Sequence, residues 1–197
     1  AGFMALSRIV NGFGTDTIAA YIAASRLDSF AMMPAMNILA AVSTFVGQNL
    51  GANKPERVKK GFQAAFSIST VISVVTTAIV VVFAEPLIEL FNSDPDVITI
   101  GASYLRIVGS FYVFFSTMFI IAGVLRGAGD TLIPMFVTLL SLWLIRIPAA
   151  ALLSKIMGSD GIWWAIPIAW LVGVVFNFLY YLTGNWKKKG EEFMNII

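Results

Sequence analysis

Long apolar segments alternate with short polar connections along the whole chain. This pattern predicts membrane-spanning helices, because a helix needs about 20 consecutive, mostly apolar residues to cross the bilayer core. We place the helices approximately at 1–13, 17–50, 57–84, 97–125, 131–153 and 163–186. The first is expected to be only the end of a helix, so we interpret the chain as a fragment. The predicted fold class is an all-α, polytopic transmembrane helical bundle.

Composition agrees with this pattern and narrows the function. The 197 residues are 58% hydrophobic and only 12% charged, with mean hydropathy +0.86, whereas soluble domains are about 45–50% apolar and about 25% charged. Cysteine and histidine are absent, which removes thiol chemistry and the most frequent general base and metal ligand. We find no nucleophile–base pair and no metal-ligand or phosphate-binding motif. We therefore expect no enzyme activity, no cofactor and no nucleic-acid partner.

The stretch 40–60, AAVSTFVGQNLGANKPERVKK, marks the end of one crossing and the start of the next. Gly47 and Gly51 form a small-xxx-small pair, which allows a neighbouring helix to approach closely in lipid. Asn53 and Glu56 have the spacing of a capping box, with Asn53 as the N-cap of the following helix. We therefore expect a new helix to begin at about residue 54.

The basic residues of the loops and the C-terminal tail lie almost entirely at one set of helix ends, which predicts the orientation in the membrane. Positive charge is retained on the cytoplasmic side, and the loops after the second and fourth crossings together with the C-terminal tail would all lie on that side. We therefore expect a multi-pass protein of the cell membrane with a cytoplasmic C-terminus. Only Lys155 lies in a loop on the other side. The basic residues of the cytoplasmic set are Lys54, Arg57, Lys59, Lys60, Arg126, Lys187, Lys188 and Lys189.

The fourth crossing ends in a second glycine-rich exit. Gly123 and Gly127 form another small-xxx-small pair. Arg126 and Asp130 stand four residues apart across the following loop, so they are candidates for a cytoplasmic latch between helices. A helix cap plus a surface charge explains the same two residues equally well.

Five ionisable residues are embedded in the outer half of predicted helices, and they are the main candidates for function. A charge at the bilayer centre costs at least about 2.5–3.5 kcal/mol, so these groups should face a bundle interior, a watery cavity or one another. They could form one polar layer at the outer mouth of a substrate or ion pathway, in which Asp28 pairs with an arginine and locks an outer gate. Alternatively, the arginines extend to the outer interface and Asp28 neutralises one of them. The residues are Arg8, Arg26, Asp28, Arg106 and Arg146.

Further pathway candidates are less charged. The aromatic and methionine-rich run 111–119, which includes Tyr112 and Met118, could line an adaptable binding cavity. Such a run more often packs against lipid or other helices. Asn37 and Asn177 are isolated polar groups in apolar surroundings, and interhelical hydrogen bonds would also explain them.

Four segments together resemble the C-terminal half of a multidrug and toxic compound extrusion (MATE) transporter. They are VGQNLGANKPERVKKG (46–61), YLRIVGSF (104–111), LRGAGDTLIPM (125–135) and LWLIRIP (142–148). The resemblance covers essentially the whole chain. It implies twelve transmembrane helices in two six-helix lobes, of which this chain, 1–197, would be the C-terminal lobe with a truncated first helix.

The resemblance also implies a function. Members of the family export drugs and other, mostly cationic, amphipathic compounds by alternating access, driven by a proton or sodium gradient. The expected partners are membrane lipids, a small-molecule substrate and the missing N-terminal lobe. In some members the tenth helix carries acidic residues for the coupling ion. The corresponding segment 97–125 has no Asp or Glu, so we expect coupling in the N-terminal lobe.

Two other functions fit the same sequence. The chain could belong to a flippase for lipid-linked oligosaccharides from the same wider superfamily, because the outward arginines would suit substrates that carry phosphates. It could instead be a half-size membrane subunit that works paired with another chain.

Overall fold

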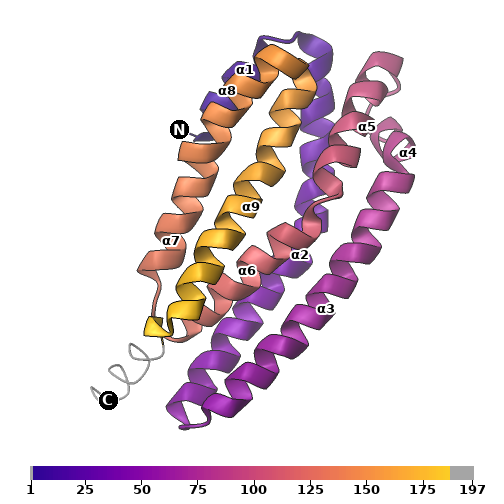
Figure 1. Ribbon diagram of the computed structural model, residues 1–197. Helices are drawn as coiled ribbons and strands as arrows, with labels where there is room; N and C mark the ends of the chain where they lie inside the picture. The colour runs from indigo at the N-terminus through magenta and orange to yellow at the C-terminus, as the bar shows by residue number, and fades with distance from the viewer. Residues whose placement is uncertain (1, 187–197) are drawn as a thin grey trace.

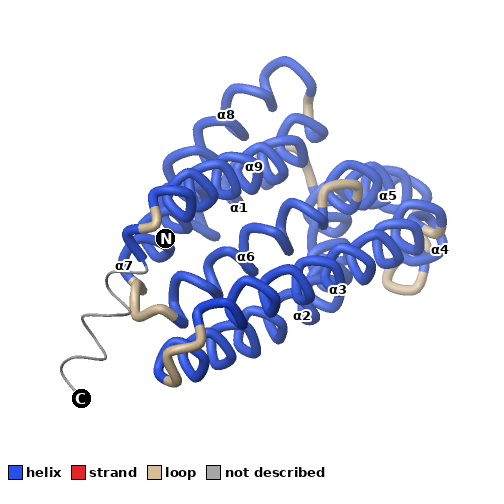
Figure 2. Tube along the Cα trace, turned by 60° about the horizontal axis from the view of Figure 1, so that its bottom comes forward, coloured by secondary structure: helices blue, strands red, loops and turns tan. Residues whose placement is uncertain are grey.

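The computed structural model describes residues 2–186 and shows a bundle of helices joined by short loops (Figures 1 and 2). No strand occurs among these residues, which confirms the all-α fold class. The elements are α1 (Gly2–Asn11), α2 (Thr15–Gly51), α3 (Pro55–Val82), α4 (Ala84–Glu89), α5 (Pro95–Gly109), α6 (Tyr112–Gly127), α7 (Leu132–Leu139), the π-helix η1 (Leu140–Ile145), α8 (Arg146–Met157) and α9 (Ser159–Thr183).

Four helices in this part of the chain are long and apolar enough to cross a membrane: α2, α3, α9 and the continuous run Leu132–Met157, which comprises α7, η1 and α8. A fifth crossing results if α5 and α6 are taken as one span with a bend of 46°. Pro34 does not interrupt α2, which continues over 37 residues. The short helix α4 lies in the connection between the predicted helices 57–84 and 97–125 and precedes the loop to α5.

Helix α6 lies at the centre of the bundle, because it packs against α2, α3 and α9. Half of the most apolar window of α9 is buried inside the bundle, against 11–17% for the other three long crossings. The outer faces of those three crossings are strongly apolar and exposed. They are therefore available to lipid or to another membrane-embedded part of the protein.

The second glycine pair brings α6 against the backbone of α2. A Cβ atom on Gly123 would lie 3.0 Å from the carbonyl oxygen of Leu39. On Gly127 it would overlap the carbonyl oxygen of Ser43 and lie 2.7 Å from the Cβ of Val46. The two helices can therefore approach this closely only because both positions lack side chains.

The first glycine pair contributes less than expected. Gly47 faces the same contact, since its Cβ would lie 3.3 Å from the carbonyl oxygen of Gly127. Gly51, in contrast, has nothing within 4 Å of a Cβ position. Of the two glycine pairs, the α6 pair therefore makes the close approach, with Gly47 as its neighbour on α2.

The turn between α2 and α3 differs from the expected capping box. Asn53 adopts a positive φ of 54°, and the amide of Lys54 donates to the carbonyl of Asn49 at 2.8 Å. Asn53 thus terminates α2 in the left-handed conformation that asparagine tolerates after a helix. Lys54 is the N-cap of α3 and makes no side-chain cap hydrogen bond, so the capping-box prediction is wrong.

The bend between α5 and α6 falls at Ser110 and Phe111, four residues beyond Arg106, which stays inside α5. A break in a membrane helix leaves backbone groups that need new partners. The hydroxyl of Thr77 on α3 donates to the carbonyl oxygen of Gly109 at 2.7 Å. A neighbouring helix therefore stabilises the break.

The crossing Leu132–Met157 contains a π-helical turn near its middle. Pro148 lacks an amide hydrogen, so it cannot donate to the carbonyl of Leu144 as a regular α-helix requires. The π-helix η1 ends at Ile145, three residues before this proline. Such turns are frequent at functional sites, and Leu142 and Arg146 from this region face the cavity described next.

Candidate functional site

A cavity of about 300 Å³ lies where α2, α5, α6, α7, η1, α8 and α9 meet. Aromatic and methionine side chains dominate its lining, and five polar or charged side chains open into it. The former are Tyr21, Met32, Met36, Tyr104, Phe115, Met118, Phe119 and Trp170, and the latter are Ser25, Asp28, Ser29, Thr138 and Arg146.

Asp28 is the only acidic residue in the lining and is 6% exposed. The hydroxyl of Tyr104 donates to its Oδ2 at 2.5 Å, and the hydroxyl of Tyr112 donates to its Oδ1. A buried carboxylate is tolerated only with such partners. Because Tyr104 lies on α5 and Tyr112 begins α6, Asp28 joins the two halves of the bent span.

Packed aromatic rings hold Tyr104 in place. Trp163, which is fully buried, stacks on Tyr21 with ring centroids 5.7 Å apart. Tyr104 meets the same indole edge-on at 4.9 Å. Rigid aromatic neighbours restrict the motion of the Tyr104 ring. Its hydroxyl is therefore directed at Asp28 rather than free to sample the cavity.

Arg146 is half-buried and shares the cavity with Asp28, but no ion pair joins them. Its Nε is buried and lacks a hydrogen-bond partner among the described residues. The expected pairing of Asp28 with an arginine is therefore not present. The single ion pair in the described part of the chain joins Arg106 and Glu85 at 2.8 Å, with the two side chains 49% and 59% exposed.

The other embedded charges do not form one layer with Asp28. Arg8 and Arg26 are exposed. Arg26 precedes Asp28 by two positions, so it points to nearly the opposite side of α2, about 200° around the helix. Asn37 is also exposed. Only Asp28 and Arg146 of the five embedded charges meet at one cavity.

Among the uncharged candidates, Tyr112 and Met118 lie at the site. Tyr112 holds Asp28, and Met118 lines the cavity while packing against Gly173. Asn177 lies outside the lining. It is fully buried, and neither amide atom has a hydrogen-bond partner in the described part of the chain. A direct hydrogen bond to another helix, the alternative to a pathway role, is not seen there.

The proposed latch is not an ion pair in this structure. Arg126 is exposed, whereas Asp130 is 1% exposed and accepts a hydrogen bond from the hydroxyl of Tyr180. The loop therefore attaches to α9 through a tyrosine. The basic tail at Lys187, Lys188 and Lys189 lies outside the described residues.

Sequence reasoning missed one of the two hydrogen-bond partners of Asp28, Tyr104. Tyr104 lies inside the segment YLRIVGSF (104–111), but none of its neighbours in the sequence indicates that its hydroxyl bonds a buried carboxylate. Tyr104 and Tyr112 are eight positions apart and meet at one carboxylate only because the chain bends between them. Tyr21 and Trp170 likewise belong to the site through packing.

This arrangement suits the binding of an amphipathic molecule. Aromatic and methionine side chains offer an adaptable apolar surface, and a buried carboxylate favours a cation in a medium of low dielectric constant. No group of three or more His, Cys, Asp or Glu that could hold a metal ion occurs among the described residues.

Comparison with known proteins identifies relatives that are described as multidrug resistance proteins or as a transporter. A family model described as MatE matches residues 1–152. The probable multidrug resistance protein YpnP of Bacillus subtilis is 37% identical over 186 residues, which is 94% of this chain and 42% of that protein. The probable multidrug resistance protein NorM of Thermotoga maritima is 31% identical over 95% of this chain and 41% of its own length. An FAD transporter of Shewanella oneidensis is 30% identical over 85% of this chain and 37% of its own length.

Solved structures agree in fold. An outward-facing multidrug resistance MATE transporter superposes with a TM-score of 0.86 at 20% identity, covering 95% of this chain and 43% of that one. An inward-facing one superposes with a TM-score of 0.86 at 19% identity, covering 95% and 44%. The chain thus spans about two-fifths of the length of these proteins. With the family model matching most of its residues, the chain belongs to the MatE family of multidrug and toxic compound extrusion transporters.

Proposed function

We propose that this chain is the C-terminal half of a secondary active transporter that exports drugs or toxic amphipathic, mostly cationic, compounds in exchange for protons or sodium ions. An N-terminal lobe would supply the other half of the pathway. The two relatives described as probable multidrug resistance proteins support export of such compounds.

The observation that supports the proposal most is that the chain matches the outward-facing and the inward-facing conformation of MATE transporters equally well. The chain superposes on outward-facing and inward-facing transporters with the same TM-score. A lobe that keeps its internal structure in both states is expected when one half rocks against the other. The close α2–α6 backbone contact at Gly127 is consistent with such a rigid unit.

The cavity around Asp28 supports a direct role of this half in binding. Its aromatic and methionine walls suit the flat, apolar part of an amphipathic molecule, and its carboxylate suits a positive charge on the same molecule. A coupling ion could occupy the same carboxylate when the substrate leaves. Substrate and ion would then compete for Asp28.

The test is efflux by the complete transporter in proteoliposomes. We expect a cationic dye to leave its compartment only when a proton or sodium gradient is imposed, and collapse of that gradient with an ionophore should stop the movement. Empty liposomes provide the control. Dye movement that is independent of both gradients would contradict ion-coupled export.

A second candidate rests on Arg146. A buried guanidinium Nε without a partner in the described part of the chain is a donor for phosphate or carboxylate oxygens. One relative is described as an FAD transporter, and FAD carries phosphates. An anionic cargo, or a lipid-linked oligosaccharide as in a flippase, would use this group. Uptake of FAD or of a labelled lipid-linked sugar in place of the dye would favour this candidate.

The half-size subunit is a third possibility, in which the partner half is a separate chain. The reading frame upstream of this chain distinguishes it from the first proposal. A contiguous N-terminal lobe would favour one twelve-helix transporter, whereas a stop and an independent start would favour a paired subunit.

We also propose that the turn between α2 and α3 and the C-terminal tail lie in the cytoplasm. The concentration of basic residues at this side supports it. Because the chain contains no cysteine, single cysteines at Asn53 and at Lys155 can be labelled with a membrane-impermeant maleimide. We expect label at position 155 from outside intact cells and at position 53 only after lysis; the reverse order would invert the topology.

A further inference from the structure

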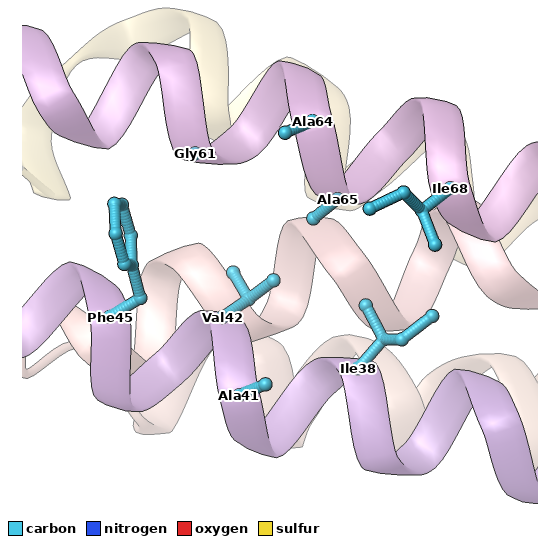
Figure 3. Close-up of a pocket in the computed structure, with 8 residues that line it drawn as sticks. All are labelled: Ile38, Ala41, Val42, Phe45, Gly61, Ala64, Ala65 and Ile68. Carbon is cyan, nitrogen blue, oxygen red and sulfur yellow. The ribbon is translucent and has the colours of Figure 1, made fainter.

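An apolar groove separates α2 from α3 near the turn that joins them (Figure 3). It has a volume of about 350 Å³, and every residue that lines it is apolar. The α3 wall consists mainly of Gly61, Ala64 and Ala65, whose small size leaves the space, while Ile38 and Phe45 rise from α2 (Figure 3). Both helices are candidate membrane spans by length and composition, so we expect the groove to lie in the lipid-embedded part of the lobe.

Basic side chains stand at one end of this groove. Arg57 and Lys60 each precede a wall residue, Gly61 and Ala64, by four positions, so they lie on the same face of α3, one turn nearer its start. Helical side chains lean toward the N-terminus of their helix. Both charges are therefore expected to lie beyond the groove, at the level of the lipid headgroups.

The surrounding charge is strongly unbalanced. Lys54 and Lys59 are exposed beside these two residues, and Glu56 is the only acid from 54 to 60. The basic residues of this turn make no ion pair in the described part of the chain. Clusters of four or more basic residues next to a membrane helix attract anionic lipid headgroups.

We propose that the groove binds one acyl chain of an anionic phospholipid, whose phosphate group contacts Arg57 and Lys60. The wall from Ile38 to Phe45 is about 10 Å long, which suits part of a single extended hydrocarbon chain. A helix with its side chains is about 10–12 Å across and cannot enter a space of this volume. The proposal is independent of what the transporter carries.

The test is lipid binding to the complete transporter, measured by native mass spectrometry with phosphatidylglycerol and phosphatidylcholine. We expect preferential retention of phosphatidylglycerol. Each basic residue near a membrane surface contributes about 1 kcal/mol to lipid attraction, equivalent to about fivefold in affinity. Arg57→Gln and Lys60→Gln should therefore each weaken phosphatidylglycerol binding about fivefold, and Lys155→Gln should leave it unchanged.

A second pair of variants tests the groove itself. Ala64→Leu fills it from the α3 wall, whereas Ala78→Leu adds the same side chain at an exposed position of α3 that does not line it. We expect only Ala64→Leu to reduce phosphatidylglycerol retention. Equal binding by both variants, or equal retention of the two lipids by the unmodified protein, would overturn the proposal. A cross-link from a cysteine at position 64 to another helix of the transporter would identify a protein occupant instead and also overturn it.

Discussion

Replacing Asp28 by asparagine is expected to lower the rate of substrate export by about tenfold to a hundredfold. The carboxylate is the only acidic group in the cavity lining, and it is buried. A hydrogen bond or contact that involves a charged group is worth about 1.5–3 kcal/mol, and each 1.36 kcal/mol corresponds to a factor of ten in rate. Initial efflux rates of the complete transporter in proteoliposomes measure the effect.

Two features keep this experiment interpretable. Asparagine has one oxygen acceptor for one tyrosine and an amide that can donate to the other, so the fold should survive; the thermal unfolding midpoint in detergent checks this. Arg106→Gln is the matched control, because Arg106 is also an embedded charge but pairs with Glu85 in an exposed position, where such pairs contribute about 0–1 kcal/mol. Unchanged efflux with unchanged ion coupling in Asp28→Asn would rule out a functional role for Asp28.

Substituting Gly127 by alanine is expected to destabilise the lobe, although alanine normally favours a helix. Relative to glycine, alanine gains about 0.8–1.0 kcal/mol of helix propensity. At this position, however, the added Cβ overlaps the carbonyl oxygen of Ser43 and approaches Val46 of α2. Overpacking of this kind costs about 1–3 kcal/mol, because a backbone cannot rotate away. We expect the unfolding midpoint in detergent to fall by about 5 °C.

Gly51→Ala is the matched control for this substitution. Gly51 and Gly127 are each the last residue of a helix, but a Cβ on Gly51 would have no atom within 4 Å. The two alanine variants should therefore differ in sign, with Gly51→Ala neutral or slightly stabilising. Equal midpoints for the two would show that α2 and α6 are not in the close contact described.

The general architecture was predictable because it depends on local composition. Apolar runs of the length of a bilayer must become helices, since lipid offers no partners for backbone groups. The bend at Ser110 and Phe111 was not predicted, although Gly109 and Ser110 form the kind of Gly/Ser pair at which helices kink. The pair alone does not require a break, because many membrane helices contain glycine. The stabilisation of the bend comes from Thr77 on another helix.

The candidate site was predictable only in part. Asp28 and Arg146 were chosen as embedded charges, and Tyr112 and Met118 as members of an aromatic and methionine-rich run. The structure places Asp28, Arg146 and Met118 in the lining of one cavity, with Tyr112 as a hydrogen-bond partner of Asp28. Arg26 and Arg106 were also chosen as embedded charges, and Asn37 as an isolated polar group, but all three are exposed. Depth in the membrane can be counted along a helix, whereas the direction of a side chain depends on which face the neighbouring helices cover.

The same distinction applies to the glycines and the loop charges. Spacing alone marks both small-xxx-small pairs, yet only the pair of Gly123 and Gly127 meets the backbone of another helix. The spacing of Arg126 and Asp130 suggests a pair, yet Asp130 is buried and bonded by Tyr180 of α9. Residues close in sequence compete with partners that only the packing of helices makes available.

By itself, the sequence determined that this protein is a helical membrane bundle and identified a carboxylate that requires an explanation, because burial of polar groups in lipid is costly wherever it occurs. The tertiary structure decided which groups satisfy that carboxylate. Tyr104 and Tyr112 converge on Asp28 across a bend, and the charge of Arg146 reaches the same cavity beside a π-helical turn. Such convergence depends on the relative positions of several helices, which no local pattern of residues specifies.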